Sequence, residues 1–495
     1  MDNDLTASAR TSLSRRTVLA GLGAVLPAAA GAETLRPRLR GTKLRPPDAI
    51  DIVRPFGLGP VTGFSLRDLS SGRILSEHQA GMSLPPASVA KALTTLYALD
   101  AMGPGYRFRT EIAITGRIAG GALEGDLYLL GGGDPTLDTD RLAELAQAVA
   151  AAGIRRVAGR AYVVGSDLPY LPNIDPGQPA HVGYNPAISG LNLNFNRVHF
   201  RWNRAASGYA VELIAAGKRY APRVSGIQLS IADRQSPIFA FRDADGRDQW
   251  SVAAGALGKT GARWLPVRRP AAHAGEVFRL LAAQFGVAMP GFVTARRAPS
   301  GGRLAQSDSP DCARLLRDMM KYSTNLTAEV AGLRASQRRG QTPATLESSG
   351  RAMSAWVRSR FGLRQAALLT HSGLTDKTRM TAGEMVQLLD IAAMGTGLDQ
   401  LMKTVPLTEA ERSKTPLPGV TVRAKTGTLY FTRGLAGYID RGGRRLAFAI
   451  FAADLNARKG FTPSAPGAPK GSKAWRNAAL RQERALLRHW ARTYL

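Results

Sequence analysis

Three short motifs place side chains capable of nucleophilic catalysis at fixed spacings along the chain. Ser88 stands three residues before Lys91, and Ser323 stands two residues before Asn325. The third motif is Lys-Thr-Gly-Thr, which begins at Lys425. A serine hydroxyl is a weak nucleophile until a neighbouring base accepts its proton, and residues i and i+3 are neighbours on a helix. The motifs therefore indicate acyl transfer in which Lys91 activates Ser88.

The remaining motif residues have types that suit the same reaction. Ser323 and Asn325 lie where one predicted helix ends and the next begins, so we expect the hydroxyl to relay a proton and the amide to hold a substrate carbonyl. A neutral Lys91 is expected because the positive end of a helix dipole at its first turn disfavours a further cation. For the third motif we expect a fixed positive charge from Lys425, hydroxyls from Thr426 and Thr428, and space for an extended peptide at Gly427. Backbone amides of Ser88 and Thr428 would form an oxyanion hole.

The first two motifs are unique in the chain, and the third occurs twice. Of the 12 lysines only Lys91 has a serine three positions earlier, and Ser323-Thr324-Asn325 is the only Ser-x-Asn sequence. Lys-Thr-Gly is found at Lys259 as well as at Lys425. The copy at Lys425 follows an alternating strand pattern over 420–424, whereas the copy at Lys259 lies in a Gly/Ala-rich stretch without alternation. We therefore expect Lys425 to belong to the site.

The periodicity of apolar residues predicts an α+β fold that is split by an insertion. Strand and helix patterns at both ends of the chain are assigned to one catalytic domain, made of residues 33–105 and 298–495, and a β-rich region is inserted at 106–297. The predicted strands cover 61–67, 73–75, 108–114, 126–130, 157–164, 198–202, 210–214, 227–231, 433–439 and 445–452. The predicted helices cover 87–102, 140–152, 276–285, 311–322, 326–337, 381–393 and 475–494.

The N-terminal 32 residues have the features of a twin-arginine signal peptide. Arg15 and Arg16 precede an apolar stretch that ends in Ala30-Gly31-Ala32, so we expect cleavage after Ala32 and an exported protein. The stretch is shorter than the ~20 residues that span a bilayer. We expect no transmembrane segment in the mature chain.

Composition narrows the classes of function. The chain has 495 residues, a formal net charge of +29, six histidines and one cysteine, Cys312. A single cysteine excludes an intramolecular disulfide, and neither metal nor any other cofactor is expected. Cys312 lies on an apolar helical stripe and is expected in the core. For an exported protein the basic excess favours anionic envelope polymers over nucleic acid as partners.

The three motifs and their order resemble the penicillin-binding proteins and serine β-lactamases. The motif spacing is similar to that of the class C low-molecular-mass penicillin-binding proteins, the D-alanyl-D-alanine carboxypeptidase/endopeptidases. Ser323 lies 235 residues after Ser88, and Lys425 lies 102 residues after Ser323. The resemblance covers roughly residues 50–455. Further stretches that carry it begin at Pro86, Gly131, Ile188, Tyr322 and Ser372.

The resemblance implies a transpeptidase fold, in which helices cover both faces of an antiparallel sheet, and an inserted β-rich region. It implies a bacterial enzyme, periplasmic or otherwise associated with the cell envelope. Such an enzyme would cleave peptidoglycan stem peptides or crosslinks through an acyl-enzyme on Ser88, and β-lactams would acylate the same serine. In relatives an acid of the insert meets the diaminopimelate amine, and Asp167 is the candidate in this chain. Thr370-His371 and Thr375-Asp376 depart from the family pattern around Ser372.

Two other functions remain compatible with the sequence. A serine β-lactamase would share all three motifs, although the wide first gap argues against it. A non-catalytic envelope-binding protein could keep the fold and would function without Ser88. A triad hydrolase is disfavoured because the chain has no Gly-x-Ser-x-Gly motif.

Overall fold

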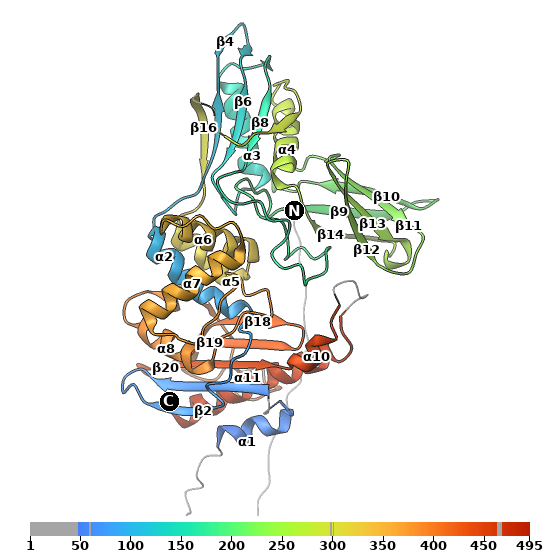
Figure 1. Ribbon diagram of the computed structural model, residues 1–495. Helices are drawn as coiled ribbons and strands as arrows, with labels where there is room; N and C mark the ends of the chain where they lie inside the picture. Colours follow the sequence, from blue (N-terminus) through green and yellow to red (C-terminus); the bar gives the residue numbers. More distant parts are fainter. Residues whose placement is uncertain (1–47, 59–60, 298, 300, 463–467) are drawn as a thin grey trace, which may run out of the picture. The chain divides into compact units, whose positions relative to one another are not determined.

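A computed structural model describes residues 48–58, 61–297, 299, 301–462 and 468–495. The predicted signal peptide lies outside these residues. A six-stranded antiparallel sheet of order β17-β18-β19-β20-β1-β2 joins the two ends of the described chain (Figure 1). Its strands are β1 (Thr62–Asp68), β2 (Ile74–His78), β17 (Lys403–Thr404), β18 (Thr421–Leu429), β19 (Thr432–Arg441) and β20 (Arg444–Ala453).

Both faces of this sheet are buried, as predicted. Along β20, Leu446, Phe448 and Ile450 join a core with α11 (Ser472–Thr493), while Ala447 and Ala449 face a second core on the opposite side. This alternation follows from the two-residue period of a strand. The second core includes residues of α2 (Lys91–Met102), α5 (Cys312–Tyr322), α6 (Asn325–Arg338), α7 (Leu346–Phe361) and α8 (Ala382–Ala393).

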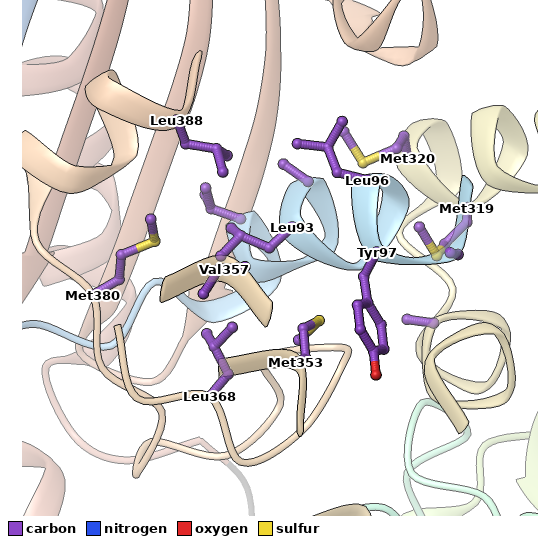
Figure 2. Close-up of a cluster of buried hydrophobic side chains, with 14 of the residues drawn as sticks. Leu93, Leu96, Tyr97, Met319, Met320, Met353, Val357, Leu368, Met380 and Leu388 are labelled. Carbon is purple, nitrogen blue, oxygen red and sulfur yellow. The ribbon is translucent and has the colours of Figure 1, made fainter. Parts of the chain in front are cut away.

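Helix α2 lies at the centre of the second core. Figure 2 shows Leu93, Leu96 and Tyr97 of α2 surrounded by side chains of α5, α7 and α8. Cys312 is part of the same core, as predicted, and burial raises the pKa of its thiol to about 12. The first eight residues of α2 are all buried, and close packing on every side holds the N-terminal part of the helix in place.

The β-rich region contains four further sheets. A five-stranded sheet has the order β15-β8-β6-β3-β16, and three-stranded sheets have the orders β4-β5-β7, β10-β9-β14 and β11-β13-β12. Helices α3 (Thr139–Ala151) and α4 (Pro270–Gln284) contribute residues to the core of this region. The strands of the region are as follows: β3 (Arg109–Ile114), β4 (Arg117–Ala119), β5 (Ala122–Glu124), β6 (Leu127–Gly131), β7 (Arg156–Val157), β8 (Ala161–Val164), β9 (Arg197–Arg204), β10 (Tyr209–Ile214), β11 (Ile227–Ala232), β12 (Phe239–Ala244), β13 (Arg247–Ala253), β14 (Thr260–Pro266), β15 (Phe292–Thr294) and β16 (Gly302–Asp308).

Three local expectations differ from the structure. Strand β16, which the sequence assigned to the catalytic domain, pairs with β3, so the sheet of the insert extends to Asp308. The Lys-Thr-Gly copy at Lys259 lies at the start of a strand after all, because Thr260 and Gly261 belong to β14, which pairs with β9. Helix α7 was not predicted at all. Its N-terminus is fixed by a capping box in which Thr345 and Ser348 exchange hydrogen bonds.

No helix in the described ranges is both long enough and apolar enough to cross a membrane.

Candidate active site

The three motifs meet at one cavity of about 460 Å³, whose lining includes Ser88, Ser323, Asn325 and Thr428. Ser88 lies in a 3-10 turn, Ala87–Ala90, and α2 begins only at Lys91. The structure thus brings together residues that are up to 340 positions apart in the sequence. Among the described residues no group of His, Cys, Asp and Glu side chains could hold a metal ion.

Lys91 has three polar neighbours around its amine, and their chemistry determines how the amine can act. Its Nζ lies 2.9 Å from Ser88 Oγ and donates to Asn325 Oδ1 at 2.8 Å and to the Ser372 carbonyl at 2.8 Å. The two carbonyl oxygens can only accept hydrogen bonds. A neutral amine would use its two N–H groups on these oxygens, and its lone pair would face the Ser88 hydroxyl. This is the arrangement that a general base requires.

Burial is what favours the neutral form of Lys91. Lys91 is fully buried, and burial lowers the pKa of its amine to about 7, while the charge of Glu329 acts in the opposite direction. The helix dipole expected from the sequence would act in the same direction as burial, because Lys91 is the first residue of α2. Glu329 is itself fully buried, and it accepts hydrogen bonds from the backbone amides of His371 at 2.9 Å and Ser372 at 2.8 Å. Glu329 therefore fixes the backbone at His371 and Ser372, and the Ser372 carbonyl accepts the hydrogen bond from Lys91.

Ser323 occupies the junction between α5 and α6. It caps α5 in the left-handed conformation, with φ 59°, and the next helix starts at Asn325. A non-glycine residue with positive φ is strained and is often found at functional sites. Ser323 Oγ accepts a hydrogen bond from Lys425 Nζ at 2.9 Å. The junction therefore presents the hydroxyl to the cavity, as the sequence indicated.

Lys425 is buried beneath Ser323 in β18, and its Nζ also donates to the Thr426 carbonyl at 2.7 Å. Burial, and then the positive charges of Lys91, Lys403 and Arg433, lowers the pKa of Lys425 well below its usual 10.5. The structure thus makes Lys425 a poorer source of fixed positive charge than the sequence suggested. A substrate carboxylate nearby would raise this pKa again.

Asn325 connects two parts of the chain. Its Oδ1 accepts from Lys91, and its Nδ2 donates to the backbone carbonyl of Tyr184 at 2.9 Å. The amide was expected to hold a substrate carbonyl, but one of its N–H groups is directed to the inserted region. The sequence could not show this contact, because the partner is a backbone atom 141 residues away.

Gly427 leaves room for the turn that carries Ser88, which the sequence did not indicate. A Cβ at this position would lie 2.5 Å from the Pro86 carbonyl oxygen and 3.0 Å from the Ser88 backbone nitrogen. Strand β18 can therefore approach Ser88 closely only because residue 427 has no side chain. Thr428 lines the cavity, and its Oγ1 accepts from Arg433 at 2.7 Å. Thr426 is half-buried in β18.

Asp167 is not brought to the cavity. Its carboxylate forms an ion pair with Arg334 of α6, and the lining contains neither residue.

Two residues that depart from the family pattern on either side of Ser372 have partners within the protein. His371 is fully buried, with Nε2 2.8 Å from Ser349 Oγ, and Asp376 accepts from Arg458 Nε at 2.7 Å.

Several lining residues have no sequence motif that would have identified them. Gln178 and Tyr184 come from the inserted region, and Lys473 and Arg476 come from the first two turns of α11. They reach the cavity through tertiary contacts alone. The other lining residues are Leu374, Leu429, Tyr430, Ala468 and Ser472.

The sequence of this chain is similar to those of known carboxypeptidases. Residues 56–467 match the model of the D-Ala-D-Ala carboxypeptidase 3 (S13) family. The chain is 27% identical over 442 residues to a D-alanyl-D-alanine carboxypeptidase of Actinomadura sp. (strain R39), which covers 83% of this chain and 81% of the relative. It is 23% identical over 422 residues to the D-alanyl-D-alanine carboxypeptidase DacB of Haemophilus influenzae, covering 81% of this chain and 87% of that protein.

Solved structures show the same fold. The crystal structure of penicillin binding protein 4 (dacB) from Haemophilus influenzae superposes with a TM-score of 0.71 at 20% identity, covering 88% of this chain and 98% of that chain. The same protein complexed with a β-lactam gives a TM-score of 0.68. The family match extends over most of the described residues and includes all three motifs. The chain therefore belongs to the D-Ala-D-Ala carboxypeptidase 3 (S13) family.

Proposed function

We propose that this protein is a serine D-alanyl-D-alanine carboxypeptidase that works through an acyl-enzyme on Ser88. The observation that carries the proposal is the environment of Lys91, whose amine lies 2.9 Å from Ser88 Oγ and has a pKa lowered to about 7 by burial. A base with a pKa near the working pH is the most effective general base.

The proposed reaction begins when Lys91 accepts the Ser88 proton and Ser88 Oγ attacks the carbonyl carbon of the penultimate D-alanine. The negative charge on the carbonyl oxygen would be stabilised by the backbone amides of Ser88 and Thr428. As the C–N bond breaks, the amine of the terminal D-alanine takes a proton, for which Ser323 is the proposed relay. Water then hydrolyses the ester and regenerates the Ser88 hydroxyl.

The edge of β18 suits the binding of an extended peptide. Strand β17 pairs only with Arg423 and Ala424, so the described structure contains no strand beside residues 425–429 on that side. Extended peptides bind such edges through main-chain hydrogen bonds. The proposed substrates are the stem peptides of peptidoglycan and, by endopeptidase action, their crosslinks. By the same chemistry, β-lactams are proposed to acylate Ser88.

We further propose that the protein is exported by a signal peptide at 1–32 and acts at the bacterial cell envelope. We also propose that residues 33–105 and the C-terminal part of the chain form the catalytic domain. The pairing of β16 with β3 favours placing the end of the insert after Asp308 instead of at 297.

The nucleophile can be tested with a fluorescent penicillin and peptide mapping. The label is expected on the peptide containing Ser88 and is expected to be lost in Ser88→Ala. Ser207→Ala, in the exposed turn between β9 and β10, serves as the matched control and should label normally. Labelling of another residue, or undiminished labelling of Ser88→Ala, would contradict the mechanism.

The substrate can be tested by mass spectrometry of muropeptides incubated with the protein. Release of D-alanine from pentapeptides indicates carboxypeptidase action, and conversion of crosslinked dimers to monomers indicates endopeptidase action. Ser88→Ala should produce neither change. Rapid turnover of penicillin with intact muropeptides would instead favour a β-lactamase.

A further inference from the structure

Arg433 of β19 reaches across the sheet to the third motif. In the pairing of β18 with β19 it lies directly opposite Thr428, and the side chains of opposed residues share one face of a sheet. Its Nη1 donates to Thr428 Oγ1 at 2.7 Å. Thr428 lines the catalytic cavity, whereas the lining does not include Arg433. Arg433 can therefore influence the cavity through the Thr428 hydroxyl.

Glu483 holds the Arg433 guanidinium in one orientation. This carboxylate belongs to α11, which contacts β19 (Figure 1). Arg433 Nε donates to Glu483 Oε1 at 2.8 Å and to Glu483 Oε2 at 3.0 Å. The Arg433 side chain is 11% exposed and the Glu483 side chain 4%. A planar guanidinium that is bonded to two different partners has a fixed direction, so the N–H group that meets Thr428 is fixed as well.

The direction of this hydrogen bond determines what Thr428 can do. A guanidinium can only donate, whereas a hydroxyl has one proton to donate and two lone pairs that accept. Because Arg433 uses a lone pair of the oxygen, the Thr428 proton must point away from Arg433. Thr428 is exposed, and within the described parts of the chain its Oγ1 has no other hydrogen-bond partner. The proton is thus available to an acceptor in the cavity, and the bond from the charged guanidinium strengthens it as a donor.

The terminal carboxylate is the acceptor that a substrate would bring to this place. A Cβ at Gly427 would lie 3.0 Å from the Ser88 nitrogen, so Thr428 directly follows the residue that lies against the Ser88 turn. In acyl transfer to Ser88 the terminal D-alanine is the leaving group, and its carboxylate is attached to the carbon next to the leaving nitrogen. This carboxylate must therefore lie beside the scissile bond, close to Ser88 and Thr428.

We propose that Arg433 is a positioning residue that presents the Thr428 hydroxyl as a hydrogen-bond donor to the terminal carboxylate of the substrate. This inference rests on the proposed acyl transfer at Ser88. The charge of Arg433 is balanced by Glu483, so Arg433 acts by orienting the hydroxyl and not by attracting the carboxylate itself. A peptide that ends in a carboxamide has no negative charge to receive this bond. The arrangement therefore favours peptides with a free C-terminal carboxylate.

The test compares two substrates with the same enzyme sample. They are an acetylated peptide that ends in D-Ala-D-Ala and the same peptide with a C-terminal carboxamide. Mass spectrometry of the released D-alanine or D-alaninamide gives kcat/KM for each. We expect the wild-type protein to prefer the acid by at least about tenfold, as for a hydrogen bond to a charged group. The acid-to-amide ratio does not depend on the folded fraction of the sample, so a loss of stability alone would leave it unchanged.

Variants of the ion pair assign this preference to Arg433. The variant Arg433→Met/Glu483→Met removes both members of the buried pair, so neither charge is left without a partner. Its ratio should fall about fivefold, because the hydroxyl is no longer oriented. Arg433→Lys keeps the positive charge but loses the fork that bonds to both partners, and its ratio should fall similarly. Arg481→Met/Glu411→Met is the matched control, because this pair also involves an arginine of α11 but lies outside the cavity lining, and it should keep the wild-type ratio.

Thr428→Val tests whether Arg433 acts through the hydroxyl. This substitution removes the hydroxyl and should lower the ratio by itself. Adding Arg433→Met/Glu483→Met to it should cause no further fall, because both changes interrupt the same interaction. A further fall would mean that Arg433 binds the carboxylate directly, which would refute the positioning role.

The remaining outcomes separate this inference from the proposed function. A ratio near one in the wild-type protein, or an unchanged ratio in Arg433→Met/Glu483→Met, would refute the inference alone. A higher ratio in that variant would also refute it. It would place the effect on Lys425, whose pKa is lowered by burial and by the charges of Lys91, Lys403 and Arg433. A wild-type protein that neither binds penicillin nor releases D-alanine would refute the proposed function and this inference with it.

Discussion

Replacement of Gly427 by alanine tests whether the close contact between β18 and the Ser88 turn positions the nucleophile. The added Cβ would lie 2.5 Å from the Pro86 carbonyl oxygen and 3.0 Å from both the Ala87 Cβ and the Ser88 nitrogen. Ordinary contact begins at 3.4 Å, so the Pro86 carbonyl would have to move by roughly 0.9 Å. Because Ser88 follows two residues later in the same turn, the hydroxyl should move with it.

A displacement of about 1 Å at a reacting group costs on the order of 100-fold in rate. We therefore expect Gly427→Ala to be acylated by a fluorescent penicillin about 100-fold more slowly than the wild-type protein. Overpacking of this kind also costs about 1–3 kcal/mol of stability, which thermal unfolding would measure. Acylation should be measured on samples whose folded fraction is known, so that the loss of rate is separated from the loss of stability.

Gly302→Ala is the matched control, since a Cβ at Gly302 in β16 would have no atom within 4 Å. This variant should keep both rate and stability. If Gly427→Ala were acylated within about threefold of the wild-type rate, the position of Ser88 would not depend on this contact, and Gly427 would not be needed to make room for the Ser88 turn.

Three further predictions concern charge. First, acylation by penicillin should rise with pH through about 7 and fall about tenfold per pH unit below it, because protonated Lys91 cannot accept the Ser88 proton; a rate independent of pH from 5 to 9 would exclude Lys91 as the base. Second, Asn325→Asp places a carboxylate about 2.8 Å from Lys91 Nζ and should raise the pKa of that amine. The rising limb of the same profile should move to higher pH by at least about one unit, and a limb that stays in place or moves to lower pH would count against the contact. Third, Glu483→Gln leaves the nearly buried Arg433 without its charged partner, and breaking such a pair costs about 3–5 kcal/mol. Urea unfolding should show this loss, and a change below about 1 kcal/mol would mean that the pair contributes little.

Secondary structure that depends on local pattern could be predicted closely. The helix expected at 311–322 is α5, Cys312–Tyr322, and the helix expected at 381–393 is α8, Ala382–Ala393. Both have an apolar stripe and a side-chain cap, which are signals within one segment. The pairing of β16 with β3 could not be predicted, because β3 lies almost 200 residues earlier and no pattern within β16 identifies that partner.

For the candidate site, as for the secondary structure, the sequence indicated what depends on short segments and not what depends on distant contacts. The sequence by itself determined the chemical types, the order and the uniqueness of Ser88, Lys91, Ser323, Asn325 and Lys425, because these are properties of short segments. It also indicated that the second serine lies at a junction between helices. These facts were enough to infer acyl transfer on a serine.

Only the tertiary structure decided how those groups are tuned and what surrounds them. The pKa of Lys91 depends on burial, Gly427 makes room for the Ser88 turn, and Asp167 is held by Arg334 away from the cavity. Lys473 and Arg476 join the lining from the last helix. The physical reason is that burial, electrostatic environment and cavity shape depend on groups from distant parts of the chain. A sequence motif specifies the reactive groups, and the packed fold specifies their environment.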